Sequence, residues 1–175
     1  TMVEADVTGL VQLREKTRGD FQGRHGVNLT FLPFVIRAVA ESLRENPLVN
    51  STWGGDAIVL KRRINIGIAT AAPDGLLVPV VRDADGLSIA SLARAVHDLA
   101  TRARERRLAV QEVQGGTFTL NNTGALGSVT GKALINHPQA AILNTEATVQ
   151  RPVVISDAIA IRSMMNLCLT FDHRV

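Results

Sequence analysis

The most informative stretch of this sequence is Gly116-Thr117-Phe118-Thr119-Leu120-Asn121-Asn122-Thr123-Gly124. Alternation from Thr117 to Leu120 predicts a strand, and the Asn-Asn-Thr-Gly that follows predicts a tight turn. Such a turn frees backbone N–H groups and side-chain amides, so Asn121 and Asn122 are candidates for contact with a ligand. Turn formation alone is the other interpretation. The glycine spacing is not that of a dinucleotide fingerprint, and no helix clearly follows.

Three amphipathic segments and a series of short apolar runs surround this stretch. Leu10, Leu13 and Phe21 recur at helical spacing, Gly26 fits the end of that helix, and Pro47 ends a second helical pattern. Helices are expected over 6–24, 30–45 and 88–107, a hairpin over 50–61, and strands over 64–68, 76–81, 117–120, 140–149 and 158–171. Helices lead the first half and strands the second, which predicts a mixed α/β domain of the two-layer α+β kind.

Length and composition restrict the class of protein. The chain has 175 residues, of which 46% are hydrophobic and 20% charged, as expected for one globular domain. No apolar run reaches the roughly 18 residues of a transmembrane helix, and Glu4 and Asp6 lie where a signal peptide would be apolar. The single cysteine, Cys168, excludes an intramolecular disulfide and a Cys-rich zinc site. We therefore expect a cytoplasmic protein without a membrane partner.

The charge pattern argues against a nucleic-acid partner. Nineteen Lys and Arg residues and 16 Asp and Glu residues give a net charge of +3, and the excess is dispersed. Five Phe, one Trp and no Tyr are too few for a base-stacking surface. Basic residues do gather at the end of the third predicted helix, where a solvated face and a phosphate site are the two interpretations. They are Arg102, Arg104, Arg106 and Arg107.

Among the four histidines, His173 has the most distinctive setting. It follows the strand-like run 165–171 and lies between Asp172 and Arg174. Opposite charges on its two sides can control the orientation and protonation of an imidazole. A salt-bridged strand end with an incidental histidine is the alternative. His97 is expected to be a partly buried or surface residue of the third helix. No two histidines have metal-ligand spacing, so no metal site is predicted.

Five segments in series resemble the catalytic domain of dihydrolipoamide acyltransferases, the core components of 2-oxo acid dehydrogenase complexes. They are Leu13-Arg14-Glu15, Leu29-Thr30-Phe31-Leu32-Pro33-Phe34, Pro73-Asp74-Gly75-Leu76-Leu77-Val78-Pro79-Val80, the 116–124 stretch and Asp172-His173-Arg174-Val175. The resemblance covers essentially the whole chain and implies a chloramphenicol-acetyltransferase-like mixed sheet flanked by helices. It also implies a homotrimer within a larger hollow core, with 2-oxo acid decarboxylase-dehydrogenase and dihydrolipoamide dehydrogenase as partner components.

The same resemblance implies acyl transfer between a dihydrolipoyl thiol and coenzyme A, which is a substrate. His173 matches the family's general base, which takes the thiol proton so that a thiolate attacks the thioester carbonyl. Asn121 stands where the family has a Ser or Thr hydroxyl that donates to the oxyanion, and an amide N–H also donates. Arg14 matches a contact to the nucleotide phosphates, Thr30 a hydroxyl-bearing contact to coenzyme A, and Asn122 a residue near the pantetheine arm.

The sequence also departs from the family pattern. Ala125 stands where the family often has Ser, and the sequence ends at Val175, before the family's Asp-Gly. We expect residues 1–175 to be a single acyltransferase catalytic domain, incomplete at both ends, with the lipoyl group on a separate domain. Three functions remain open: a lipoyl-linked acyltransferase, for which acetyl or branched-chain acyl groups are favoured; a catalytically inactive core scaffold; and a free-standing coenzyme A-dependent acyltransferase.

Overall fold

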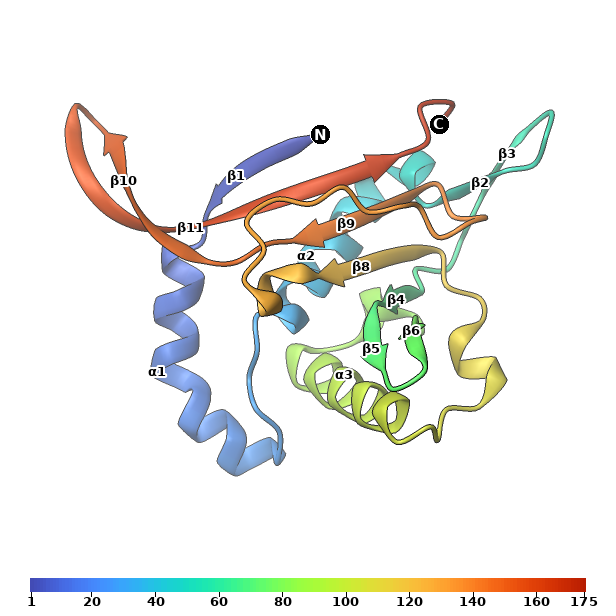
Figure 1. Cartoon of the computed structure of the whole chain (residues 1–175), viewed down its shortest axis with the longest axis horizontal. Helices are drawn as coiled ribbons and strands as arrows, with labels where there is room; N and C mark the ends of the chain where they lie inside the picture. Colours follow the sequence, from blue (N-terminus) through green and yellow to red (C-terminus); the bar gives the residue numbers. More distant parts are fainter.

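A mixed sheet flanked by three α-helices organises the computed structural model, which describes all residues from Thr1 to Val175 (Figure 1). The sheet order is β1-β11-β9-β8-β4-β7, and β10 pairs with the outer part of β11. The three inner strands β4, β8 and β9 are parallel, whereas β7, β10, β11 and β1 run antiparallel to their neighbours. The strands are β1 (Met2–Asp6), β4 (Ile66–Ile68), β7 (Val80–Val81), β8 (Phe118–Asn122), β9 (Ala141–Thr145), β10 (Val149–Ile155) and β11 (Ala158–Phe171).

The helices begin and end at the residues that their local chemistry favours. They are α1 (Thr8–His25), α2 (Leu32–Glu45) and α3 (Ile89–Arg104). Gly26 ends α1 in the left-handed conformation, with φ of 71°, as expected for a residue without a Cβ. Pro33 lies in the first turn of α2, and the Ser88 hydroxyl accepts a hydrogen bond from Ser91 N at 3.2 Å at the start of α3. Short 3₁₀ turns follow at η1 (Pro47–Val49), η2 (Ala84–Gly86), η3 (Val110–Val113) and η4 (Thr123–Leu126).

One hydrophobic core lies between the sheet and helices α2 and α3. Ile36 of α2, Leu92 of α3 and Ile66 of β4 are completely buried in it, and Leu120 of β8 is 1% exposed. Burial of each such side chain stabilises the fold by about 1.5–3 kcal/mol. Helix α1 contributes no buried residue, and Figure 1 shows it standing beside the sheet rather than over the core.

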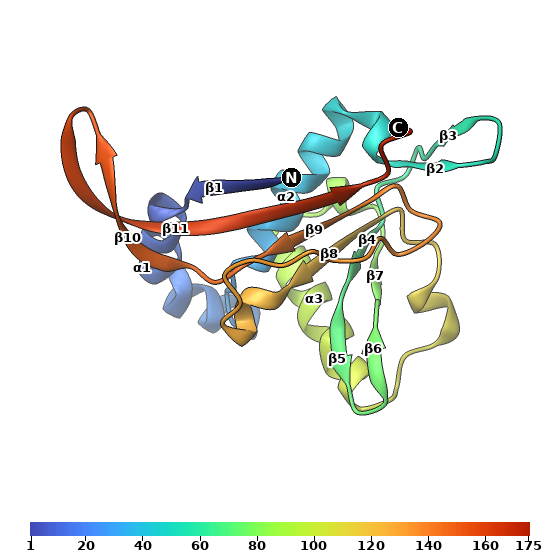
Figure 2. The same cartoon turned by 45° about the horizontal axis from the view of Figure 1, so that its top comes forward.

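Two short hairpins and one long arm extend from this body. The hairpins are β2 (Ser51–Trp53) with β3 (Ile58–Leu60), and β5 (Thr70–Ala72) with β6 (Gly75–Leu77). The arm consists of β10 and the first half of β11, and Figure 2 shows it reaching beyond the other strands. Its apolar side chains face solvent in the single chain, with Ile159 80% and Ile161 71% exposed.

The predicted fold class and the order of elements are confirmed, and three expectations are wrong. Residues 76–81 are not one core strand, because Pro79 separates exposed β6 from buried β7. The expected strand 140–149 is interrupted after Thr145 and divides into β9 and β10. The expected first helix starts later, at Thr8, since residues Met2–Asp6 form β1 against β11. None of the helices has the length and apolar character needed to traverse a bilayer.

Candidate functional site

A cavity of about 460 Å³ opens at the carboxyl ends of β4 and β8. The ends of parallel strands meet at one edge of a sheet, where α/β folds commonly bind ligands. Here the loop between α1 and α2, helix α3 and the turn η4 complete the walls. Three of the predicted site residues line this one cavity: Thr30, Asn121 and Asn122.

The two asparagines at the end of β8 have different roles. The Asn122 side chain accepts a hydrogen bond from Ala125 N at 3.3 Å and caps η4, so it shapes the turn, as the simpler interpretation of this segment predicted. The half-buried Asn121 side chain forms no hydrogen bond within the chain and lines the cavity. Its amide is therefore free to donate to a ligand.

A buried carboxylate supports this turn from behind. Glu146, which follows β9, is 2% exposed and accepts a hydrogen bond from the Thr123 hydroxyl at 2.7 Å. Gly124 packs directly on the Glu146 backbone, where a Cβ at Gly124 would lie 2.2 Å from the carbonyl carbon. Only glycine fits at that position, so the glycine that ends the Asn-Asn-Thr-Gly sequence is required by packing.

Arg14 lies outside the cavity and is already bonded within the chain. Its Nε donates to Leu29 O at 2.8 Å, Nη1 donates to Glu15 at 2.9 Å, and the guanidinium lies 5.1 Å from the centroid of the Phe31 ring. These contacts fix the loop that carries Thr30. Arg14 is thus adjacent to the site through the loop, and its predicted contact with phosphates stays a prediction.

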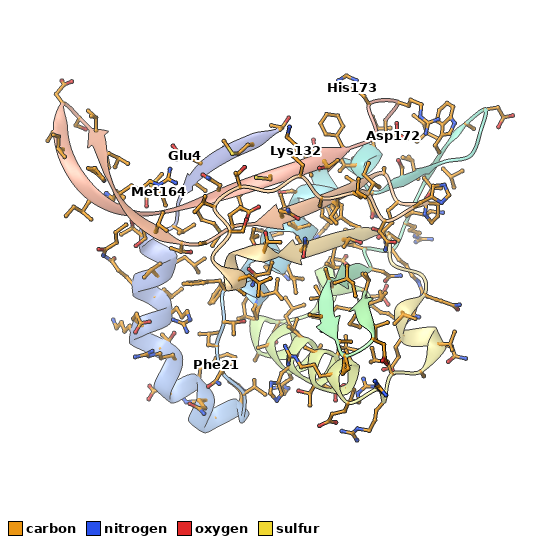
Figure 3. The ribbon with its side chains drawn as sticks, viewed as in Figure 1. Glu4, Phe21, Lys132, Met164, Asp172 and His173 are labelled. Carbon is orange, nitrogen blue, oxygen red and sulfur yellow. The ribbon has the colours of Figure 1, made fainter.

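His173 lies in a separate, exposed turn after β11 (Figure 3). Its ring centroid is 5.4 Å from that of Phe171. Arg174 donates to the Asp172 carboxylate at 2.6 Å, and its guanidinium lies 4.6 Å from the centroid of the Trp53 ring. Hydrogen bonds from the Arg174 side chain and backbone lower the pKa of Asp172 to about 2, so this carboxylate is ionised at neutral pH.

The structure does not bring His173 and Asn121 together within one chain. Asn121 is paired with Asn144 of β9, which is paired with Cys168 of β11. Because β9 and β11 are antiparallel, their carboxyl ends lie at opposite edges of the sheet. From Cys168 to the end of β11 alone is roughly 10 Å at about 3.3 Å per residue. His173 lies beyond that end.

Several residues near the cavity and near the His173 turn were not identified as site residues from the sequence. Arg104 and His97 of α3 line the cavity. His97 was expected to be a partly buried or surface residue, and the cluster that contains Arg104 was interpreted as either a solvated face or a phosphate site. The separation of His97 and Arg104 by two helical turns on one face was the available signal. Glu146 was missed because an acidic residue after an apolar strand usually faces solvent. The contact of Trp53 with Arg174 joins segments far apart in the chain and leaves no local pattern.

Comparison with known proteins identifies the family. All residues, 1–175, match the model of the 2-oxoacid dehydrogenases acyltransferase catalytic domain. The lipoamide acyltransferase component of the branched-chain alpha-keto acid dehydrogenase complex from Bacillus subtilis is 49% identical over 100% of this chain, which spans 42% of that relative. A probable dihydrolipoamide acetyltransferase from Listeria monocytogenes is 51% identical with a TM-score of 0.97, over 99% of this chain and 74% of that one.

Two further solved structures are similar to this chain. Azotobacter vinelandii dihydrolipoamide acetyltransferase, studied for a serine, a histidine and an asparagine in its catalytic mechanism, has a TM-score of 0.97 at 36% identity. The match covers 100% of this chain and 72% of that one. Chloramphenicol acetyltransferase, at 16% identity, has a TM-score of 0.57 over 96% of this chain and 75% of its own, which confirms the expected fold alone. The chain therefore belongs to the family of 2-oxoacid dehydrogenase acyltransferases, by its catalytic domain.

Proposed function

We propose that the protein transfers an acyl group between a dihydrolipoyl thiol and coenzyme A, with His173 as general base and Asn121 as oxyanion donor. One observation carries the assignment of these two residues. The serine and the histidine studied in the Azotobacter enzyme are separated by as many residues as Asn121 and His173. In this chain, Asn121 lies one residue before the end of β8, with a free amide at the cavity wall.

His173 begins the reaction as the base. An ordinary thiol has a pKa of about 8.5 and is only a few per cent ionised at neutral pH. The imidazole takes the thiol proton, and the thiolate attacks the carbonyl carbon of the thioester. When the tetrahedral intermediate collapses, the other sulfur leaves and recovers the proton from the imidazolium. The reverse direction uses the same steps.

Asn121 stabilises the charge that develops between these steps. The attack turns the thioester oxygen into an oxyanion, and the Asn121 amide N–H donates a hydrogen bond to it. Loss of such a donor typically costs about 2.7–4 kcal/mol of transition-state stabilisation. An amide replaces the hydroxyl of the family pattern, and an amide N–H also donates, so the departure keeps a hydrogen-bond donor at this position.

This mechanism requires two copies of the chain. His173 of one copy and Asn121 of a neighbour must meet, since each copy holds the two groups at opposite edges of its sheet. The exposed apolar residues of the β10–β11 arm and the unburied face of α1 are the surfaces that a second copy covers. Cyclic symmetry repeats one such contact around a ring, and we propose a homotrimer with three equivalent sites.

The wider assembly is part of the same proposal. The lipoyl group is carried on a separate domain, and the trimers build a hollow core that works with the decarboxylase-dehydrogenase and dihydrolipoamide dehydrogenase components. The acyl group is acetyl or branched-chain, and Thr30, Asn122 and Arg14 contribute to coenzyme A binding or to the loops that form its site. The B. subtilis relative, a component of a branched-chain complex, supports the branched-chain alternative.

The test is acyl transfer to dihydrolipoamide by the purified protein. Acetyl-, isobutyryl- and succinyl-coenzyme A are compared as donors under single-turnover and steady-state conditions. We expect acetyl or isobutyryl transfer to exceed succinyl transfer in kcat/KM. Failure to transfer any of the three groups would contradict the proposal and support an inactive core scaffold. Equal transfer to unrelated small thiols would support a free-standing acyltransferase instead.

A further inference from the structure

The cavity has a distinctive charge. None of its nineteen lining residues is acidic, and its only ionisable side chains are His97 and Arg104. Both come from α3, two turns apart, with Ala100 between them on the same wall. The carboxylate of Glu146, which accepts a hydrogen bond from the lining residue Thr123, is buried and does not line the cavity. The space in front of α3 therefore favours an anionic group.

Arg104 is the one arginine of its cluster that is free to bind a ligand. Arg102 pairs with Asp98 and Glu112, both at 2.6 Å, Arg106 pairs with Asp74 at 2.6 Å, and Arg107 pairs with Glu105. Arg104 forms no ion pair and no side-chain hydrogen bond, and it is exposed at the cavity wall. A guanidinium in this state offers up to five donors in a planar fork.

Arg14, the other cation near the site, is by contrast already bonded within the chain. Its Nε and Nη1 are bonded within the chain, it pairs with Glu15, and one face lies against Phe31. It positions the loop before α2 and does not line the cavity. The available positive charge therefore comes from α3.

We propose that Arg104, with His97 two turns away on the same helix face, binds a phosphate group of coenzyme A at the α3 wall of the cavity. This inference rests on the proposed function, because it assumes that the cavity receives coenzyme A. A planar guanidinium matches a phosphate through two parallel hydrogen bonds. Arg104 is exposed, so it contacts the hydrated, charged end of an extended ligand, while the half-buried Asn121 faces the reacting end.

Binding measurements on the whole protein test this assignment with two probes. Coenzyme A carries phosphates and pantetheine carries none, so titration calorimetry with each separates phosphate contacts from contacts to the arm. For Arg104→Ala we expect the Kd of coenzyme A to rise about tenfold, the loss of one charge-assisted contact. Pantetheine binding stays unchanged, and the salt dependence of coenzyme A binding becomes weaker. Arg104→Lys keeps part of the affinity.

Arg107→Ala is the matched control, because it removes the same charge three residues away but outside the cavity. It leaves both affinities unchanged, and circular dichroism shows that every variant is folded. Wild-type coenzyme A affinity in Arg104→Ala, or equal losses in Arg107→Ala, overturns the inference. So does a selective loss of succinyl- over acetyl-coenzyme A binding, which would assign Arg104 to an acyl carboxylate. Absence of coenzyme A binding by the unmodified protein overturns the proposed function as well.

Discussion

The two edges of the central sheet support their functional groups in different ways. At the β8 edge, Asn121 lies on a buried strand, and the following turn is packed on Glu146 and closed by Gly124. At the β11 edge, His173 is exposed on a turn that surface contacts hold: the Asp172–Arg174 ion pair and the stacking of Arg174 on Trp53. The first edge is held by core packing and the second by contacts at the surface, both polar and aromatic.

This difference indicates how the complete site is assembled. A rigid oxyanion donor keeps its geometry before substrate arrives, which electrostatic stabilisation of a transition state requires. In the proposed mechanism, the exposed His173 gains its final environment only when a neighbouring copy covers it. Mutations at either edge should therefore act on a site shared by two copies. Those at the β8 edge alter a donor that its own copy supports, whereas those at the β11 edge alter a base that the neighbour covers.

The largest expected effect comes from removing the base. His173→Ala should fold but transfer acyl groups about 10²–10⁴-fold more slowly, as is typical for loss of a general base. Asn121→Ala should be similarly impaired. When the two variants are refolded together, roughly a quarter of the subunit contacts in a random ring regain one intact His173 and one intact Asn121. Activity of the mixture measures that recovery.

The same experiment contains its control. Each variant refolded with itself should stay inactive, and size-exclusion chromatography should give one oligomer throughout. A mixture no more active than its components would mean that both groups act from the same copy, against the opposite-edge geometry. His173→Ala activity within about threefold of wild type would remove this residue from the mechanism.

Substitutions of Asn121 give the next largest effect. Asn121→Ala should lower kcat by about 10²–10³ through loss of the oxyanion donor, and Asn121→Ser should retain much of the activity. Asn121→Asp is nearly isosteric but places a negative charge beside the oxyanion, so it should be worse than Ala. Rates at saturating substrate compare the three. If the rate of Asn121→Asp equals or exceeds that of Asn121→Ala, Asn121 only shapes the turn.

The sequence predicted local structure well where one segment carries the whole signal. Gly26 and Pro47 marked helix ends, and 116–124 marked the strand and turn at the cavity. The strand break at Glu146 and the contact between Trp53 and Arg174 depend on partners distant in the chain, so periodicity did not reveal them. The separation of His173 from Asn121 was equally hidden, because motif order along a chain does not encode the edge at which each motif lies.

A smaller effect on kcat is expected from substitution of Trp53, the tryptophan that Arg174 contacts. Trp53→Ala removes the aromatic face 4.6 Å from the guanidinium, which loosens the His173 turn. Such an exposed cation–π contact is worth about 0.5–1 kcal/mol, so kcat should fall by roughly two- to fivefold with KM unchanged. Trp53→Phe should recover most of the rate. Val59→Ala, on the partner strand of the same hairpin, is the control for general disturbance.

The outcome has an independent spectroscopic check. Trp53 is the only tryptophan in the chain, so its fluorescence reports on the Arg174 contact directly. Arg174→Ala should change the emission, whereas a substitution at the β8 edge should not. An unchanged rate in Trp53→Ala, together with unchanged emission in Arg174→Ala, would mean that the hairpin does not position the His173 turn.

The smallest effect concerns stability at the α3 end of the cavity. Hydrogen bonds from Arg102, and then from the Ala109 backbone, lower the pKa of Glu112 to about 2 from its usual value of 4.5. A carboxylate whose pKa is depressed by folding stabilises the native state above its unfolded pKa, and that contribution disappears as the pH falls through the folded pKa. Glu112→Gln should therefore lower Tm by about 1–2 °C at pH 7. The difference from wild type should shrink as the pH falls from about 4.5 towards 2.

Calorimetric unfolding from pH 7 to pH 3 measures this difference, with Glu45→Gln, an exposed acid of α2 without an ion pair, as the control. The effect is small because the Arg102–Glu112 pair is partly exposed, with 24% and 31% of the two side chains accessible, and water screens its attraction. The pair nevertheless leaves Arg104 as the free cation of α3. Glu112→Gln should consequently leave coenzyme A affinity unchanged or slightly raise it, since it removes one of the two acidic partners of Arg102 and does not touch Arg104. A loss of affinity equal to that of Arg104→Ala would show that the ionic network as a whole, rather than Arg104, faces the ligand.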